Sequence, residues 1–168
     1  MKRKEYLKVV LILPGNVLIT IPLLIFLFTR NSFSYHLVSP NNFLFYVAIF
    51  FLTLGLFLVI WSVRTFFTRG GEGTPGPWRP VSNLIISGPY CYVRNPMILG
   101  AVALLLFESA LFASIPFLLW AIVFFVGNVI YFKIFEEKEL IKRFGEDYKD
   151  YKNEVPMLFP KFTSYNKR

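Results

Sequence analysis

The stretch that decides the fold is residues 97–135, MILGAVALLLFESALFASIPFLLWAIVFFVGNVIYFKIF. A helix of about 20 apolar residues crosses the hydrocarbon core of a membrane, so this run is long enough for two short crossings. Ser114 and Pro116 interrupt it near the middle. Proline is tolerated in the first turn of a helix and disrupts its interior, so a second arm should begin close to Pro116. The run predicts a hairpin of two membrane helices, 97–113 and 115–135.

Two more apolar segments precede the hairpin, 7–28 and 43–63, and each has the length of one crossing. The composition agrees, because a chain with 55% hydrophobic residues is too apolar for an ordinary soluble domain. Residues 7–28 exceed the roughly 7 to 15 residues of a signal-peptide core, so we expect them to be retained. The sequence predicts one all-α integral membrane domain, 1–168, with four transmembrane helices.

The Lys and Arg residues predict the orientation. Four lie in residues 1–8, four in 64–96 and nine in 133–168, whereas the segment 29–42 has one. Short loops rich in Lys and Arg stay cytoplasmic, which predicts both termini on that face. Anionic lipid headgroups account for the net charge of +8, so we expect no nucleic-acid partner. The short chain fits a bacterial or archaeal plasma membrane, with an endoplasmic reticulum membrane left open.

Function is expected in the two long segments outside the spans, the cytoplasmic loop 68–96 and the tail 136–168. Glycine and proline recur in the loop, which predicts either an ordered loop or a flexible lid rather than a helix or strand; a plain linker is the simplest alternative. Trp78 favours a loop that packs at headgroup level. The tail is predicted to be helical to Phe144, with Gly145 as a cap or kink.

Helical spacing along the tail aligns one stripe of residues and leaves most lysines off it. The stripe consists of Glu137, Leu140 or Ile141, Phe144, Tyr148 and Tyr151; the lysines are Lys138, Lys142, Lys149 and Lys152. Such a stripe usually reflects helix packing alone. An acidic pair such as Glu136 and Glu137 is likewise often only solvated. The segment YCYVRNP, residues 90–96, emerges at the same rim, so acids, an arginine, an amide and tyrosines can converge there.

This set of groups suits a cationic ligand that also carries hydroxyl and carboxylate groups. Carboxylates accept hydrogen bonds from ribose hydroxyls or an ammonium, and the forked donors of Arg94 suit a carboxylate. Tyrosine rings attract a cation within about 6 Å. S-adenosylmethionine has all of these groups and is one candidate among several.

The order GPYCYVRNPMILG (88–100), a membrane hairpin, then EEKELIKRFGEDYKDYKNEVPMLFP (136–160) resembles the membrane methyltransferases typified by isoprenylcysteine carboxyl methyltransferase, together with the phospholipid N-methyltransferases. The resemblance covers about residues 83–160. It implies an integral membrane enzyme that binds S-adenosylmethionine at the cytoplasmic rim and methylates a lipophilic acceptor from the bilayer. We expect no obligate protein partner.

The resemblance also implies a set of site residues. Arg94-Asn95-Pro96 would occupy the family's Arg-His-Pro position, and Glu136 and Glu137 its paired acids. Arg94 and Glu137 are the candidate catalytic residues, with Glu137 or Glu136 acting as base if the acceptor arrives protonated. The implied cofactor-binding residues are Tyr90, Tyr92, Arg94, Asn95, Pro96, Leu99, Gly100, Glu136, Glu137, Leu140, Tyr148 and Tyr151.

Four positions depart from the family pattern: Cys91 and Met157 where arginine is expected, Asn95 where histidine is common, and Ile98 where tyrosine is frequent. The amide of Asn95 can still bind an adenine edge, although it cannot act as a base. An apolar residue at Met157 makes a carboxylate acceptor doubtful and favours an amine, a phospholipid headgroup or a thiol. Cys91 is the only cysteine, so a multi-cysteine metal cluster is excluded.

Two other functions stay open. A membrane reductase of sterol-reductase type would need several arginines or a helix N-terminus for the phosphates of NADPH, and the loop offers Arg69, Arg79 and Arg94 without a clear phosphate nest. A non-catalytic membrane protein that keeps the fold is the other. Glu108 lies within the third span, where a carboxylate is costly. It could be a hydrogen-bonded helix contact, a group near the outer interface, or part of a substrate tunnel. His36 is expected to be solvent-exposed.

Overall fold

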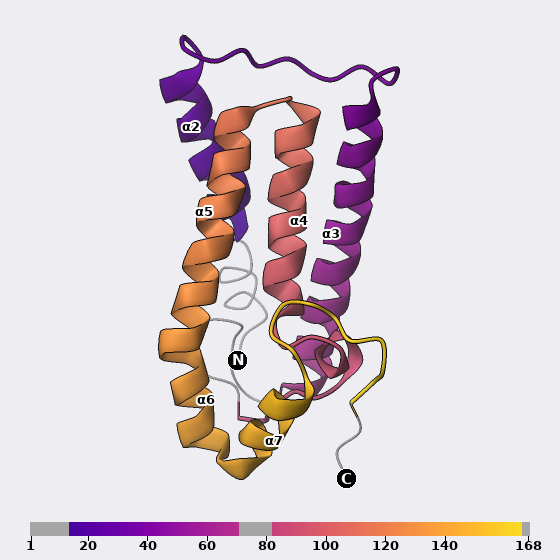
Figure 1. The fold of residues 1–168 in the computed structure, drawn as a ribbon, viewed down its shortest axis with the longest axis vertical. Coiled ribbons are helices and arrows are strands. Elements are labelled where there is room, and N and C mark those ends of the chain that lie inside the picture. The colour runs from indigo at the N-terminus through magenta and orange to yellow at the C-terminus, as the bar shows by residue number, and fades with distance from the viewer. Residues whose placement is uncertain (1–13, 71–81, 166–168) are drawn as a thin grey trace. The chain divides into compact units, whose positions relative to one another are not determined.

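A computed structural model describes residues 14–70 and 82–165, and within these ranges every regular element is helical and none is a strand, which confirms the all-α prediction. The elements are η1 (Asn16–Thr20), α2 (Ile21–Thr29), α3 (Phe43–Arg69), η2 (Gly88–Cys91), α4 (Pro96–Leu111), α5 (Ile115–Tyr131), η3 (Phe132–Glu136), α6 (Glu137–Phe144) and α7 (Glu146–Glu154) (Figure 1). Trp78 and the start of the first predicted span lie outside the described residues.

The contacts divide the chain into two compact units. The first consists of Met1–Phe57 and Gly100–Phe125, and the second of Leu58–Leu99 and Val126–Arg168. Helices α3, α4 and α5 are each divided between the two units.

In the first unit, α4 and α5 form the predicted hairpin (Figure 1). Helix α5 begins at Ile115, as the sequence predicts. The Ser114 hydroxyl oxygen accepts a hydrogen bond from the Phe117 N–H at 3.3 Å, which caps the first turn of α5. Ala113 adopts a φ of 45° and reverses the chain just before this cap. Pro116 follows within the first turn, where it breaks no helical hydrogen bond.

Two contacts hold the helices of the first unit together. A Cβ built on Gly55 of α3 would lie 2.8 Å from the Leu104 side chain and 3.1 Å from the Gly100 carbonyl oxygen, so only glycine allows this approach. The indole Nε1–H of Trp120 donates to the Val17 carbonyl at 3.1 Å, which joins α5 to η1.

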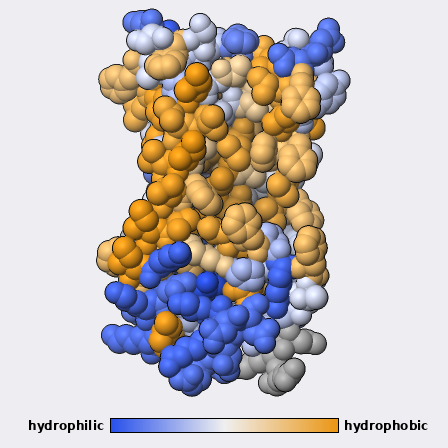
Figure 2. Space-filling model, in the orientation of Figure 1, coloured by the Kyte–Doolittle hydropathy of each residue, from blue (hydrophilic) through white to orange (hydrophobic). Residues whose placement is uncertain are grey.

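Two helices are long and apolar enough to cross a membrane: Phe43–Arg69, and the continuous helix Ile115–Phe144 formed by α5, η3 and α6. Only 11% of the most apolar stretch of α3 is buried inside the protein, and Phe43 is 77% exposed. Apolar surface of this extent indicates contact with lipid rather than with water. Figure 2 shows apolar residues over α5 and polar residues gathered over α6 and α7.

The other two predicted crossings correspond to shorter apolar helices, Asn16–Thr29 and Pro96–Leu111. Helix α3 continues to Arg69, beyond the predicted boundary at residue 63. Four crossings therefore stay a prediction.

The tail of the second unit is bent at Gly145, as predicted. Gly145 has a φ of 56° and separates α6 from α7, a conformation that glycine adopts without steric cost. Behind the bend lies a core made of Tyr148, Tyr151 and Val155. The partly buried residues packed against it are Leu84, Ile86, Leu140, Ile141, Phe144 and Tyr165.

Candidate active site

The two motif segments meet in the second unit through one charged cluster. An Nη1–H of Arg94 donates to Glu137 Oε1 at 2.6 Å, and Nη1 also lies 3.2 Å from the Tyr148 hydroxyl. Lys152 Nζ donates to the other carboxylate oxygen, Oε2, at 2.5 Å. The side chains of Arg94 and Glu137 are only 9% and 8% exposed. The predicted convergence of Arg94, Glu137 and Tyr148 is therefore present in the structure.

The local backbone explains how Arg94 is presented. Pro96 opens α4, so Arg94 lies in the short coil just before a helix. Gly88 begins η2 with a φ of 58°, and a Cβ there would lie 2.6 Å from Thr65 Oγ1 and 3.1 Å from Trp61 Nε1. The start of η2 is thus pressed against the end of α3 at a position that only glycine fits.

The end of the chain runs alongside the segment that presents Arg94. The backbone N–H of Arg94 donates to the Pro156 carbonyl at 3.0 Å, and the N–H of Lys161 donates to the Tyr92 carbonyl at 3.0 Å. The Tyr165 N–H reaches the Cys91 carbonyl at 3.1 Å. These three hydrogen bonds fix the backbone from Cys91 to Arg94.

The tyrosines of the site are neutral. Tyr151 donates its hydroxyl to the Tyr90 carbonyl at 2.7 Å. Burial raises the pKa of Tyr148 to about 12, although the nearby Arg94 opposes the shift. Burial also raises the pKa of Tyr151, reinforced by Tyr148, and the pKa of Tyr90, reinforced by the Glu136 carboxylate. All three phenols keep their protons at neutral pH.

Two donors of the cluster are buried without a partner. Arg94 Nε and Asn95 Nδ2 make no hydrogen bond to any residue that the structure describes. A buried polar group left unpaired costs about 1–3 kcal/mol, so such groups are uncommon unless a ligand satisfies them. Adjacent unpaired guanidinium and amide donors fit the carboxylate and adenine acceptors of S-adenosylmethionine. The donor set of this chain is thus compatible with that cofactor.

Phe132 and Lys152 belong to the cluster although the sequence analysis did not select them. The guanidinium carbon of Arg94 lies 5.7 Å from the centre of the Phe132 ring, and Phe132 is buried. The tail lysines are predicted mostly to avoid the stripe, and Lys152 is the exception, because its ammonium pairs with Glu137. On a helical wheel the 15 residues from Glu137 to Lys152 amount to a net rotation of about 60°, so Lys152 lies at the edge of the stripe that contains Glu137.

The remaining predicted site residues vary in their surroundings. Leu140 packs on the tyrosine core, and the Tyr92 ring lies 6.4 Å from that of Trp61. Gly100 lies in the first unit beside Gly55. Those with intermediate exposure are Tyr90, Tyr92, Asn95, Leu99, Glu136 and Leu140, whereas Pro96 and Gly100 are buried. Their part in binding a cofactor stays a prediction.

Comparison with known proteins identifies the family. Residues 43–147 match the phospholipid methyltransferase family. The chain belongs to this family. The matched range includes Arg94, Asn95 and Glu137 and ends before Tyr148 and Lys152.

A curated relative is methanethiol S-methyltransferase 2 of Bradyrhizobium diazoefficiens. It is 36% identical to this chain over 75 residues, which cover 43% of this chain and 27% of the relative. The match thus spans about a quarter of that protein's length. No solved structure matches this chain.

One position that departs from the family pattern has a structural role. Met157, where the resemblance leads one to expect arginine, is 8% exposed. It directly follows Pro156, whose carbonyl accepts the Arg94 N–H. An apolar side chain therefore occupies a buried site next to the backbone that holds Arg94.

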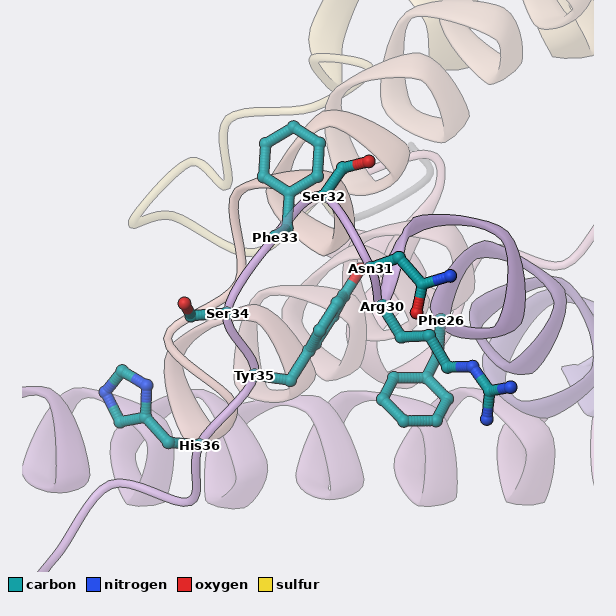
Figure 3. Close-up of a pocket in the computed structure, with 8 residues that line it drawn as sticks. All are labelled: Phe26, Arg30, Asn31, Ser32, Phe33, Ser34, Tyr35 and His36. Atoms are coloured by element: carbon teal, nitrogen blue, oxygen red, sulfur yellow. The ribbon is translucent and has the colours of Figure 1, made fainter.

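Two pockets lie away from the charged cluster. One, of about 550 Å³, is lined by Phe26 and residues 30–36. Figure 3 shows Arg30 and Asn31 on one side of the Tyr35 ring and His36 on the other, so its polar groups do not converge. His36 is exposed, as predicted.

The other pocket, of about 380 Å³, is lined by Arg69 and residues 83–87. Neither pocket is lined by Arg94 or Glu137. Both oxygens of Glu137 instead hold protein cations, so a cation of a ligand that approaches this carboxylate meets Arg94 or Lys152 there.

Proposed function

We propose that this member of the phospholipid methyltransferase family transfers a methyl group from S-adenosylmethionine to a lipophilic acceptor in the membrane. The observation that carries the proposal is the buried Arg94–Glu137 pair, with Arg94 Nε and Asn95 Nδ2 unpaired beside it among the described residues. Family membership and the methyltransferase relative support the same reaction class.

Arg94 and Asn95 would hold the cofactor through their unpaired donors, the guanidinium to a carboxylate and the amide to an adenine edge. Glu137 would accept from an ammonium or a ribose hydroxyl. The neutral tyrosines would contribute ring faces toward a positive charge. The other predicted contacts are Tyr90, Tyr92, Pro96, Leu99, Gly100, Glu136, Leu140, Tyr148 and Tyr151.

The cofactor supplies an electrophilic methyl group on a positively charged sulfur. The chain's own groups then have mainly to hold both reactants in line, and orientation of this kind contributes up to about 7–11 kcal/mol for well-aligned pairs. A base is needed only for an acceptor that arrives protonated. Glu137 or Glu136 would take that proton.

The acceptor is proposed to be a thiol, an amine or a phospholipid headgroup rather than a carboxylate. The buried, apolar Met157 offers no cation for a carboxylate acceptor. The relative's name specifies a thiol acceptor, and the family's name specifies phospholipids. Screening lipid and thiol extracts with a labelled methyl donor would identify the product directly.

The proposed topology is four crossings, at 7–28, 43–63, 97–113 and 115–135, with both termini in the cytoplasm. The distribution of Lys and Arg supports this orientation. A tag at the C-terminus should resist external protease in intact bacterial or archaeal cells. Digestion of that tag would contradict the orientation while leaving the site assignment untouched.

Titration calorimetry of the detergent-solubilised chain tests the function. We expect S-adenosylmethionine and its demethylated product, S-adenosylhomocysteine, to bind with measurable heat and NADPH to give none. Binding of NADPH alone would instead support a membrane reductase. Binding of neither would support a non-catalytic protein that keeps the fold.

A further inference from the structure

The two cations that pair with Glu137 differ in how deeply their side chains are buried. The Arg94 side chain is 9% exposed, contacts Tyr148 and lies over the Phe132 ring, so it is fixed from three directions. The Lys152 side chain is 37% exposed and reaches Glu137 from α7. Lysine has a flexible stem and a strongly hydrated ammonium, so Lys152 can leave the carboxylate for water more easily than Arg94 can.

The group that Lys152 presents to Glu137 is a primary ammonium, placed 2.5 Å from Oε2. The methionine part of the proposed cofactor also ends in a primary ammonium. Because Oε1 accepts from the buried Arg94, Oε2, whose partner Lys152 is 37% exposed, is the more open of the two oxygens for such a group. The two ammonium groups therefore compete for Oε2, and like charges close together repel each other.

We propose, on the basis of the proposed function, that Lys152 occupies the position on Glu137 that the cofactor's ammonium takes. Lys152 then sets the affinity for ligands that carry the amino-acid part of the cofactor. It does not touch the adenosine part. Removing the charge of Lys152 should strengthen the binding of ligands that carry the amino-acid part and leave the binding of ligands without it unchanged.

The chain provides a matched control on the same helix. Lys149 pairs with Glu146 at 2.7 Å, but these side chains are 50% and 79% exposed. Lys149→Met removes the same charge from α7 without touching Glu137. Lys152→Arg is a second control, because it keeps a cation beside Oε2.

The test is titration calorimetry of the full chain in detergent with two ligands. S-adenosylhomocysteine carries the ammonium, and 5′-methylthioadenosine lacks the whole amino-acid part. We expect Lys152→Met to bind S-adenosylhomocysteine about fivefold tighter, in line with the strength of a half-exposed ion pair. Its affinity for 5′-methylthioadenosine should stay at the wild-type value. Lys149→Met should match the wild type for both ligands, and Lys152→Arg, whose guanidinium leaves the carboxylate less easily, should show no gain in affinity for S-adenosylhomocysteine.

Three results would overturn the proposal, and they differ in what they imply. Unchanged or weaker binding of S-adenosylhomocysteine by Lys152→Met would show that Lys152 supports the site. An equal gain for both ligands would indicate general loosening of the tail. If the wild type binds neither ligand, both the role of Lys152 and the proposed function are wrong. If Lys152→Met fails to fold, as judged by a cooperative thermal transition, Lys152→Gln answers the same question.

Discussion

Replacing Glu137 by glutamine should destabilise the second unit by an amount set by the burial of its ion pair. The change leaves Arg94, which is 9% exposed, without a compensating charge. Breaking a buried pair by removing one partner costs about 3–5 kcal/mol. The glutamine oxygen still accepts one hydrogen bond, and the pair with the half-exposed Lys152 contributes at most about 1 kcal/mol. We therefore expect a loss of about 2–4 kcal/mol in the free energy of unfolding.

The assay is reversible unfolding of the purified chain, followed by circular dichroism as SDS is titrated into mild detergent. Glu146→Gln is the matched control, because it breaks the exposed pair with Lys149 and should cost under about 1 kcal/mol. Combining Glu137→Leu with Arg94→Met removes both charges together and should recover most of the loss. The reasoning would be refuted if Glu137→Gln lost no more stability than Glu146→Gln. It would also be refuted if the double variant lost the sum of the free energies that Glu137→Leu and Arg94→Met lose singly.

Three further outcomes can be measured in the same way. Gly88→Ala should cost about 1–3 kcal/mol, because the added Cβ would lie 2.6 Å from Thr65 Oγ1 at a φ of 58°; wild-type stability would contradict the packing of η2 on α3. Tyr151→Phe should cost about 1 kcal/mol, because the Tyr90 carbonyl loses its donor; no loss would mean that the hydrogen bond contributes nothing. The pKa of Tyr148 is raised to about 12 in the folded chain, against about 10 in the unfolded one, so its contribution is complete below pH 10 and is lost as the pH rises toward 12. Tyr148→Phe should lack this part of the pH dependence, and an identical profile in both proteins would refute the assignment.

The sequence predicts the parts of this fold that depend on local chemistry. The break at Ser114 and Pro116 locates the start of α5, and a glycine after an amphipathic run locates the bend between α6 and α7. The apolar segments predict an all-α membrane protein because continuous apolar runs of about 20 residues cross lipid as helices, which satisfy their own backbone hydrogen bonds. The resemblance adds the expectation that Arg94 and the acids Glu136 and Glu137 share one site across the hairpin.

Long-range geometry is the part that the sequence could not supply. Lys152 follows a buried tyrosine, and the residue spacing places it only at the edge of the stripe, so its ion pair with Glu137 emerges from the structure and not from the sequence. Gly55 looks like an ordinary glycine within a span until the neighbouring Leu104 and Gly100 are placed. The residue spacing likewise does not predict that protein cations occupy both carboxylate oxygens of Glu137.

The central claim is that Arg94 and its neighbours hold an S-adenosyl ligand, and equilibrium binding of radiolabelled S-adenosylmethionine to the wild type and to Arg94→Lys tests it most directly. Lysine keeps the charge next to Glu137 but removes the Nε donor and the planar fork. We predict saturable binding by the wild type and affinity at least about tenfold weaker in Arg94→Lys, the equivalent of about 1.4 kcal/mol. Lys149→Met should bind like the wild type. Equal binding by the wild type and Arg94→Lys, or no saturable binding by the wild type, would contradict the claim.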